Sequence, residues 1–154
     1  FIHSCEITAY MPSAKIIHCR RNPMDNILSM LRSNLMAGLN DFTVNPEDAA
    51  NVLIAQEKAM QLHRSNYFNQ IYTFNYDAFA NNPEPIIRPL IDWLELEWLE
   101  EYLYPEQSKR AIITSSVIQA RRPINNKSVG NWIKYRGLLQ RAEKIIKNSG
   151  LFEI

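Results

Sequence analysis

The chain has 154 residues, of which 46% are hydrophobic, with 17 basic and 16 acidic residues and a formal net charge of +1. This length and composition suit one globular domain with its own core and exclude a disordered chain. The near-balance of charge argues against a nucleic-acid binder, so any anion site is expected to be local. No apolar run approaches the roughly 20 residues of a membrane span. Two cysteines are too few for a disulfide scaffold, and cytoplasmic residence is the default expectation.

The first expected elements lie between residues 1 and 38. Residues 1–11 have the pattern of a helix end, which Pro12 stops. Residues 14–19 are β-prone and predict a short buried strand. Pro23 suits the first turn of a following helix, because its missing N–H is not needed there. That helix is expected to end at Gly38 and to carry an apolar stripe formed by Ile27, Leu28, Leu31 and Leu35.

The remaining elements are predicted from caps and composition. They are a helix capped by Asn45 and running to about Arg64, an aromatic strand over 71–76, a helix opened by Asn82, Pro83 and Glu84, a mostly loop segment over 105–128, and short helices over 129–135 and 138–148. This order predicts an α/β fold. A parallel sheet buried by helices normally has more than two strands, so either further strands complete this one or its core is incomplete.

A polar segment follows the first predicted strand. It reads Arg20-Arg21-Asn22-Pro23-Met24-Asp25-Asn26-Ile27-Leu28-Ser29. Ligands of open α/β sheets bind at the carboxyl ends of strands, and a guanidinium beside the N–H groups of a helix start suits a phosphate. The residues alone leave a second interpretation equally open, in which both arginines and Ser29 are solvated surface residues.

A second polar segment runs from Thr114 to Trp132. It contains hydroxyls, two arginines, a lysine and amides in a loop with Pro123. Such a loop can wrap a phosphorylated ligand, with Trp132 packing its base onto the domain. The alternative is a flexible connector, but long loops in compact domains are uncommon unless they are functional or disordered, which favours a ligand.

These two segments together resemble a known family. Residues 14–23, with Asp25 and Ser29, look like the 3′-phosphate-binding segment of sulfotransferases that use 3′-phosphoadenosine 5′-phosphosulfate. The bacterial branch related to tyrosylprotein sulfotransferases, often fused to tetratricopeptide repeats, is the most similar. Residues 114–135 are similar to the C-terminal donor-binding segment of that branch, and Tyr76-Asp77 to its Tyr-acid pair.

The resemblance implies roles for residues of the donor site. Arg21 and Ser29 would bind the 3′-phosphate, and Tyr76 would lie near the adenosine. Tyrosine-sulfating relatives also have an arginine shortly after the serine. Arg32 is one position away from that place, so its role stays open.

The second segment receives its roles from the same resemblance. Ser116 is expected near the transferring sulfuryl group, as the catalytic residue. Arg121 or Arg122 would close over the nucleotide phosphate, and the resemblance does not choose between these two. Ser128 belongs to the same donor-binding segment.

The implied architecture is an incomplete P-loop-NTPase-like sulfotransferase domain, with residues 1–154 as a single partial domain. The chain lacks an initiator Met and a Gly-rich phosphate loop. The phosphosulfate loop and the catalytic base of the family would precede Phe1, so the chain is expected to be the C-terminal part of a longer protein.

The implied reaction is sulfuryl transfer from 3′-phosphoadenosine 5′-phosphosulfate to a hydroxyl acceptor on a peptide, carbohydrate or small molecule, with protein tyrosine as one candidate. No metal ion, nucleic acid or membrane is expected to take part.

Two other functions remain. A P-loop kinase would need a Gly-x-x-x-x-Gly-Lys-Ser/Thr loop, which this sequence lacks. A non-catalytic remnant that only binds nucleotide, or serves as an interaction domain, has the same motifs as the enzyme. Binding of adenosine 3′,5′-bisphosphate separates a surviving half-site from a chain that folds poorly.

Overall fold

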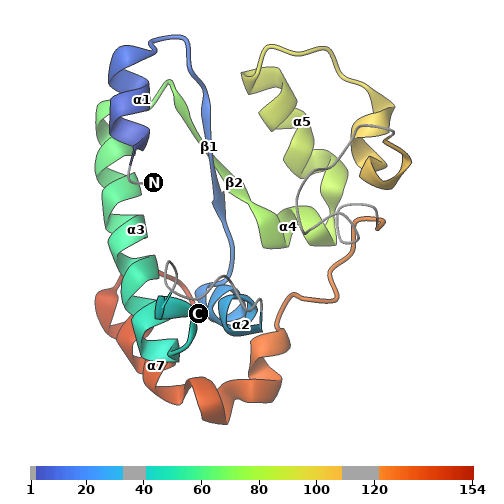
Figure 1. The fold of residues 1–154 in the computed structure, drawn as a ribbon. Helices are drawn as coiled ribbons and strands as arrows, with labels where there is room; N and C mark the ends of the chain where they lie inside the picture. The colour runs from blue at the N-terminus through green and yellow to red at the C-terminus, as the bar shows by residue number, and fades with distance from the viewer. Residues whose placement is uncertain (1–2, 33–40, 109–121) are drawn as a thin grey trace.

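The structure is a computed structural model that describes residues 3–32, 41–108 and 122–154. Its α-helices and strands are α1 (Ser4–Tyr10), β1 (Ile16–Arg20), α2 (Pro23–Arg32), α3 (Pro46–Asn66), β2 (Ile71–Asn75), α4 (Tyr76–Asn81), α5 (Pro83–Trp93) and α7 (Arg136–Ser149). Short 3-10 helices are η1 (Asp41–Thr43), η2 (Glu100–Leu103), η3 (Pro105–Gln107) and η4 (Asn131–Tyr135). The chain is a mixed α/β protein with a small parallel sheet (Figure 1).

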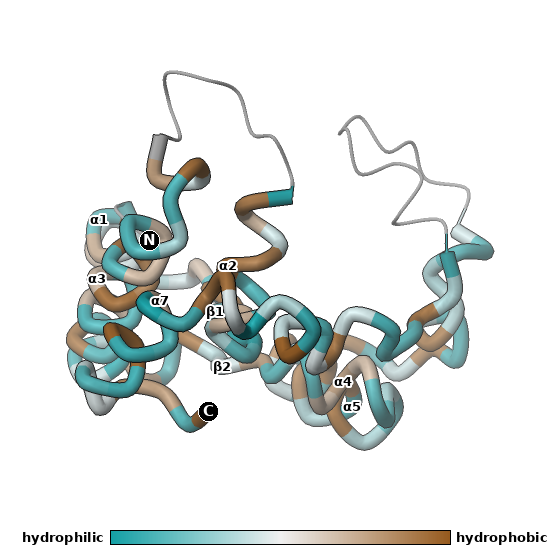
Figure 2. Tube along the Cα trace, turned by 90° about the horizontal axis from the view of Figure 1, so that it is seen from below, coloured by the Kyte–Doolittle hydropathy of each residue, from teal (hydrophilic) through white to brown (hydrophobic). Residues whose placement is uncertain are grey.

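The sheet pairs β1 with β2 in parallel, and His18 lies beside Thr73. Because successive side chains of a strand point to opposite faces, these two residues share one face. That face meets α3, where Arg64 Nη1 donates to Thr73 Oγ1 over 2.7 Å. On the other face, the ring of Tyr72 lies 5.3 Å from that of Trp93 in α5. Helices therefore lie on both sides of the strand pair, as Figures 1 and 2 show from two directions.

The prediction of a buried first strand is wrong for most of its residues. In β1 the buried residue is His18, while Ile17 is 40% exposed and Cys19 is exposed as well. The physical reason is that the described sheet has two strands, so neither strand has neighbours on both edges.

The second strand ends one residue earlier than predicted. Tyr76 is the first residue of α4 because the side chain of Asn75 caps that helix, with Asn75 Oδ1 accepting from the N–H of Ala78 over 3.0 Å. A cap of this kind satisfies a backbone donor that the helix itself cannot pair.

The predicted helix starts are confirmed. α2 begins at Pro23 and α5 at Pro83, and α3 begins after Asn45, whose Oδ1 accepts from the N–H of Glu47 over 2.9 Å. The predicted continuation of α2 beyond Arg32 falls outside the described residues. The two predicted terminal helices are present as η4 and the longer α7.

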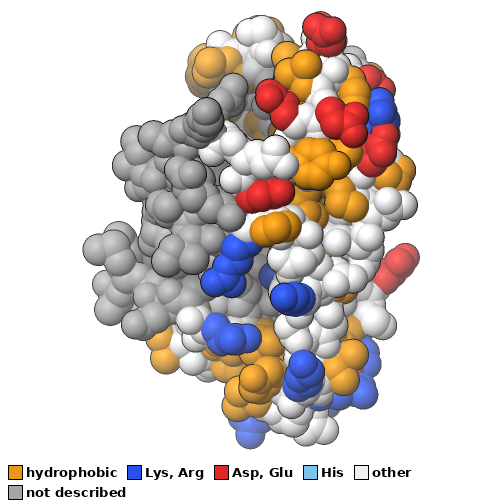
Figure 3. Space-filling view, turned by 90° about the vertical axis from the view of Figure 1, so that its right-hand side faces the viewer, with side chains coloured by type: hydrophobic (Ala, Val, Ile, Leu, Met, Phe, Trp, Pro, Cys, Tyr) orange, Lys and Arg blue, Asp and Glu red, His pale blue; other side chains and the backbone are white. Residues whose placement is uncertain are grey.

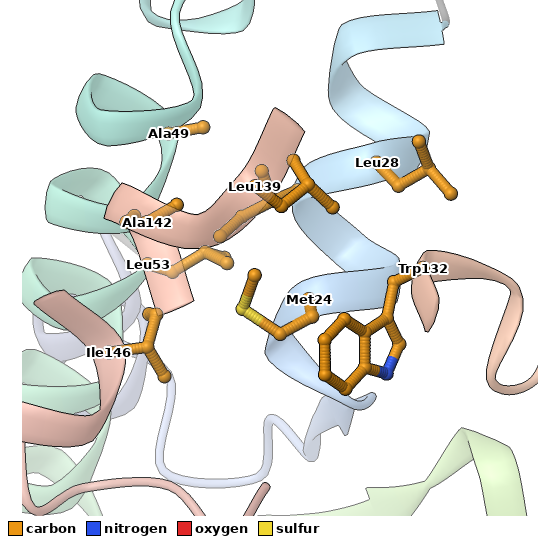
Figure 4. Close-up of a cluster of buried hydrophobic side chains, with 10 residues drawn as sticks. Met24, Leu28, Ala49, Leu53, Trp132, Leu139, Ala142 and Ile146 are labelled. Atoms are coloured by element: carbon orange, nitrogen blue, oxygen red, sulfur yellow. The ribbon is translucent and has the colours of Figure 1, made fainter. Parts of the chain in front are cut away.

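The largest buried cluster joins α2, α3 and α7 rather than the sheet. Met24, Ile27, Leu139 and Ile146 are fully buried in it. Figure 4 shows Met24, Leu139 and Ile146 converging, with the indole of Trp132 beside the start of α2. Trp132 is 9% exposed, so it anchors η4 on α2 as the sequence predicted.

Candidate functional site

Two consecutive arginines at the carboxyl end of β1 turn to opposite sides of the sheet, because side chains alternate along a strand. Arg20 turns toward α3, where its Nε lies 3.3 Å from Oε2 of Glu57, a side chain that is only 4% exposed. Arg64 Nη2 lies 3.5 Å from the other oxygen of Glu57. Arg20 Nη2 also donates to the carbonyl of Leu151 over 3.5 Å. Arg20 is thus held by a buried carboxylate, although its own side chain is 36% exposed.

Arg21 turns toward α4 and the C-terminal segment. Its Nη2 donates to the carbonyl of Ser128 over 2.8 Å. Its Cζ lies 5.3 Å from the centre of the Tyr76 ring, within the range of a cation–π contact. The side chain is 19% exposed, and its Nε atom is buried. Three segments that are distant in the sequence therefore meet at this one cation.

The carboxylate of Asp77 balances part of this charge. Asp77 Oδ1 lies 3.7 Å from Arg21 Nε, and both atoms are buried without a hydrogen-bond partner among the described residues. The other oxygen, Oδ2, accepts from the backbone N–H of Asn22 over 2.6 Å. Because Asp77 neutralises Arg21 in part, an anion bound here needs further positive charge nearby.

The expectation that backbone N–H groups of this turn face an anion is wrong for three residues. The N–H of Asn22 donates to Asp77, and those of Met24 and Asp25 donate to Asn22 Oδ1 over 2.9 and 3.3 Å. Pro23 has no N–H to offer. Any anion binding at this turn must therefore rely on side chains.

Asp25 joins the first polar segment to the second. Its side chain is 2% exposed and accepts from the N–H of Gly130 over 2.6 Å and from the N–H of Trp132 over 2.9 Å. Gly130 has φ of +74°, a backbone conformation that strains residues with a Cβ. The two segments singled out in the sequence are consequently in direct contact.

The other predicted residues of α2 and the second segment lie around this contact. Ser29 is exposed on α2, four positions after Asp25 and therefore on the same side of the helix. Ser128 is half-buried and contributes its carbonyl to Arg21. Arg122 is exposed, while Ser116 and Arg121 fall outside the described residues.

Charge is divided between the two ends of the face that Figure 3 presents, with acidic side chains gathered at the top and basic ones below. Acidic residues are dense in the segment 92–106, which contains Asp92, Glu95, Glu97, Glu100, Glu101 and Glu106. The basic residues of the C-terminal segment include the exposed Arg122, Lys127 and Lys134. Arg21 is bonded to this basic segment through Ser128, which favours an anionic ligand there.

A small cavity lies on the α3 side of β1. Its volume is about 30 Å³, and His18, Arg20, Glu57 and Phe152 are among its lining residues. The pKa of His18 is lowered to about 4, mainly by burial and in addition by the nearby positive charges of Arg64 and Arg20. The space suits a few water molecules and is too small for a nucleotide.

Sequence reasoning quoted Asp25 within a motif but assigned it no role. A signal was present, since Asp25 stands between Met24 and Ile27, which form part of an apolar helix face. A carboxylate at the buried side of a helix requires hydrogen-bond donors from elsewhere. The sequence did not indicate that those donors would be the N–H groups of Gly130 and Trp132.

Comparison with known proteins decides the family. Residues 3–100 match the sequence pattern described as "Sulfotransferase family". The chain belongs to the sulfotransferase family. The matched residues of this sulfotransferase-family chain include both strands, Arg21, Ser29 and the Tyr76-Asp77 pair.

The chain is similar to a protein from Aquifex aeolicus (strain VF5). It is named "Uncharacterized protein" and is 29% identical over 143 residues, which are 92% of this chain and 19% of the relative. The chain thus spans about a fifth of the length of this curated relative.

No three His, Cys, Asp or Glu side chains of the described ranges lie close enough to hold a metal ion. No described helix is both long and apolar enough to cross a membrane.

Proposed function

We propose that this chain binds the 3′-phosphate of 3′-phosphoadenosine 5′-phosphosulfate as part of a sulfotransferase. The convergence of three segments on the Arg21 guanidinium supports this function best, since Ser128, Asp77 and Tyr76 all contact it. A guanidinium held by such contacts is well suited to a phosphate, because its planar donors match two phosphate oxygens.

The residues present are chemically suited to the nucleotide. Arg21 supplies a charged donor and Ser29 an exposed hydroxyl on the same side of α2 as Asp25. Arg122 and Lys127 add the positive charge that Asp77 makes necessary. The aromatic ring of Tyr76 offers a surface next to the adenosine.

The second polar segment supplies the remaining proposed roles. Ser116 acts near the transferring sulfuryl group, and Arg121 or Arg122 closes over the nucleotide phosphate together with Ser128. The bound donor supplies the sulfuryl group, and adenosine 3′,5′-bisphosphate is left when a hydroxyl acceptor has taken it. Donors aimed at oxygens that gain charge during such a transfer lower its barrier.

The wider proposal places the chain in the bacterial branch related to tyrosylprotein sulfotransferases. In that branch the chain is the C-terminal part of a P-loop-like domain, whose other half carries the phosphosulfate loop and the catalytic base. A protein tyrosine is one candidate acceptor, and a fusion with tetratricopeptide repeats is one candidate context.

Calorimetric titration with adenosine 3′,5′-bisphosphate tests the donor site. Arg21→Ala should weaken binding by about 1–3 kcal/mol, the cost of a charged hydrogen bond left unmade. Arg141→Ala is the matched control, since it removes the same charge from a side chain of α7 that is 87% exposed. Equal affinities of wild type and Arg21→Ala would remove Arg21 from the site.

A nucleotide-binding remnant without transferase activity is the second candidate, because the sequence contains no Gly-rich phosphate loop. Incubation of the longest available form of the protein with sulfur-labelled donor and a tyrosine peptide, a sugar and a simple phenol separates the two. Label in any acceptor supports a transferase, whereas nucleotide binding without transfer to any of them supports the remnant.

A further inference from the structure

The buried carboxylate of Asp25 has no function assigned to it so far. It is 2% exposed, and both of its oxygens accept a backbone N–H from residues more than a hundred positions away in the chain, at 2.6 Å from Gly130 and 2.9 Å from Trp132. Hydrogen bonds to an ionised carboxylate are roughly twice as strong as those between neutral groups. A side chain in this arrangement fixes two backbone positions of η4 with respect to α2.

We propose that Asp25 is a positioning residue that holds the C-terminal segment in the donor site, so that the affinity for nucleotide depends on it without any contact to the ligand. This inference rests on the proposed function. Asp25 acts on Arg21 through a short chain of contacts. It fixes Gly130 and Trp132, the turn before them carries Ser128, and the carbonyl of Ser128 accepts a hydrogen bond from Arg21 Nη2.

Arg21 gains a defined orientation from this arrangement. Its contact on the other side is the Asp77 carboxylate, and Asp77 is itself bonded to the N–H of Asn22. If the hydrogen bonds to Asp25 are lost, the Ser128 carbonyl is no longer fixed, and Arg21 keeps its contacts with Asp77 and the Tyr76 ring. The guanidinium is then drawn toward an anion of its own chain, and a bound phosphate has to compete with it.

The fold also explains why η4 needs such a fixed point. Trp132 packs against α2 in the core, but Gly130 before it has φ of +74° and Ile133 after it is 63% exposed. The indole alone therefore fixes one side chain, whereas the two hydrogen bonds of Asp25 fix the path of the backbone.

The test compares Asp25→Asn with wild type. An asparagine has the same size but only one accepting oxygen, so one of the two N–H groups loses its acceptor. Ile71→Ala is the control for lost stability, because Ile71 is 6% exposed and lies at the opposite end of the strand pair from Arg20. Hydrogen exchange of the Gly130 and Trp132 amides and the dissociation constant of adenosine 3′,5′-bisphosphate are measured for all three proteins.

We expect Asp25→Asn to weaken nucleotide binding at least tenfold and to speed amide exchange at Gly130 or Trp132 more than at the other amides of α2 and α7. Ile71→Ala should bind within about twofold of wild type. Asp25→Asn that binds as tightly as wild type, or that loses affinity only in proportion to its overall stability as Ile71→Ala does, overturns the proposal. Unchanged exchange at both amides overturns it too.

The two proposals can fail separately. If wild type does not bind adenosine 3′,5′-bisphosphate at all, the proposed function fails, and with it the role of Asp25 in nucleotide affinity. The exchange data then still decide whether Asp25 fixes η4.

Discussion

At the scale of single residues, neighbouring arginines of identical chemistry have different environments. Arg20 lies against the buried carboxylate of Glu57, whereas Arg21 meets Asp77, Tyr76 and Ser128. Only the resemblance to sulfotransferases singled out Arg21 in the sequence, because the residue pattern of two arginines after a strand does not show which side each one faces. The register of β1 with β2 supplies that information.

Arg20→Ala should therefore lower stability with little effect on nucleotide affinity, whereas Arg21→Ala should weaken nucleotide binding. It leaves Glu57 in the interior with Arg64 as its remaining arginine partner and should lower the free energy of unfolding by about 1–3 kcal/mol. Its affinity for adenosine 3′,5′-bisphosphate should stay within about twofold of wild type. Urea unfolding and calorimetry measure the two effects, and a strong loss of affinity would place Arg20 in the nucleotide site.

His18 should make the stability sensitive to mild acid. Burial lowers its pKa from 6.5 to about 4 in the folded chain, so the unfolded chain takes up the proton first as the pH falls. The contribution is fully present above pH 6.5 and is lost progressively between pH 6.5 and 4. The loss can reach about 3 kcal/mol, at about 1.4 kcal/mol for each unit of pKa difference.

The measurement is the difference between wild type and His18→Gln in unfolding free energy, followed from pH 7.5 to 4.5. Wild type should lose stability relative to the variant across this range. Glu143 does not interfere, because Arg136 and Lys147 lower its pKa from 4.5 to about 2, so its contribution is lost mainly between these two values and is shared by both proteins. Parallel curves for the two proteins would contradict a neutral, buried His18.

At the scale of elements, the sequence predicted helix starts well because they depend on local chemistry. Asn45 before Pro46 and Pro23 after the arginines act within a few residues of themselves. Burial of β1 was predicted poorly, since it depends on how many strands lie beside it. The sequence also could not predict that the Asp77 carboxylate accepts the N–H of Asn22 at the start of α2, because the two residues are distant in the chain.

The Asn45 cap gives a quantitative expectation for α3. Asn45→Ala removes the acceptor of the Glu47 N–H and should lower the free energy of unfolding by about 1 kcal/mol, within a usual range of about 0.5–2. Asn45→Asp keeps an acceptor and adds a charge that the helix N-terminus favours, so it should stay close to wild type. Thermal unfolding measures the stability of the two variants. Equal losses of stability would mean that the Asn45 side chain does not cap the helix.

At the scale of the whole molecule, stability is concentrated where α2, α3 and α7 meet. α7 carries two neighbouring leucines with opposite environments, since Leu139 is fully buried and Leu138 is 69% exposed. Leu139→Ala should cost about 2–5 kcal/mol through lost burial and the cavity left behind. Leu138→Ala, which removes the same atoms from the surface, should change stability by less than about 0.5 kcal/mol.

Equilibrium unfolding in urea measures the free energy of unfolding of Leu139→Ala and Leu138→Ala. A comparable loss for both variants would show that α7 does not pack on α3 with the face seen here. The apolar spacing of this helix was visible in the sequence, but the partner helices were not, because nothing in α7 specifies which distant face it covers.

The parallel pairing of β1 with β2 has a consequence for how the chain folds. Ile16 pairs with Ile71, so the chain segment that contains α2 and α3 must form a closed loop before the first residue pair of the sheet can form. Closing so long a loop costs entropy that only later contacts offset, which makes strand pairing a late and slow event compared with the formation of α3. A refolding experiment should therefore detect helical signal before the Tyr72–Trp93 ring contact develops. The contact between Arg21 and the Ser128 carbonyl should form only after β1 has paired with β2.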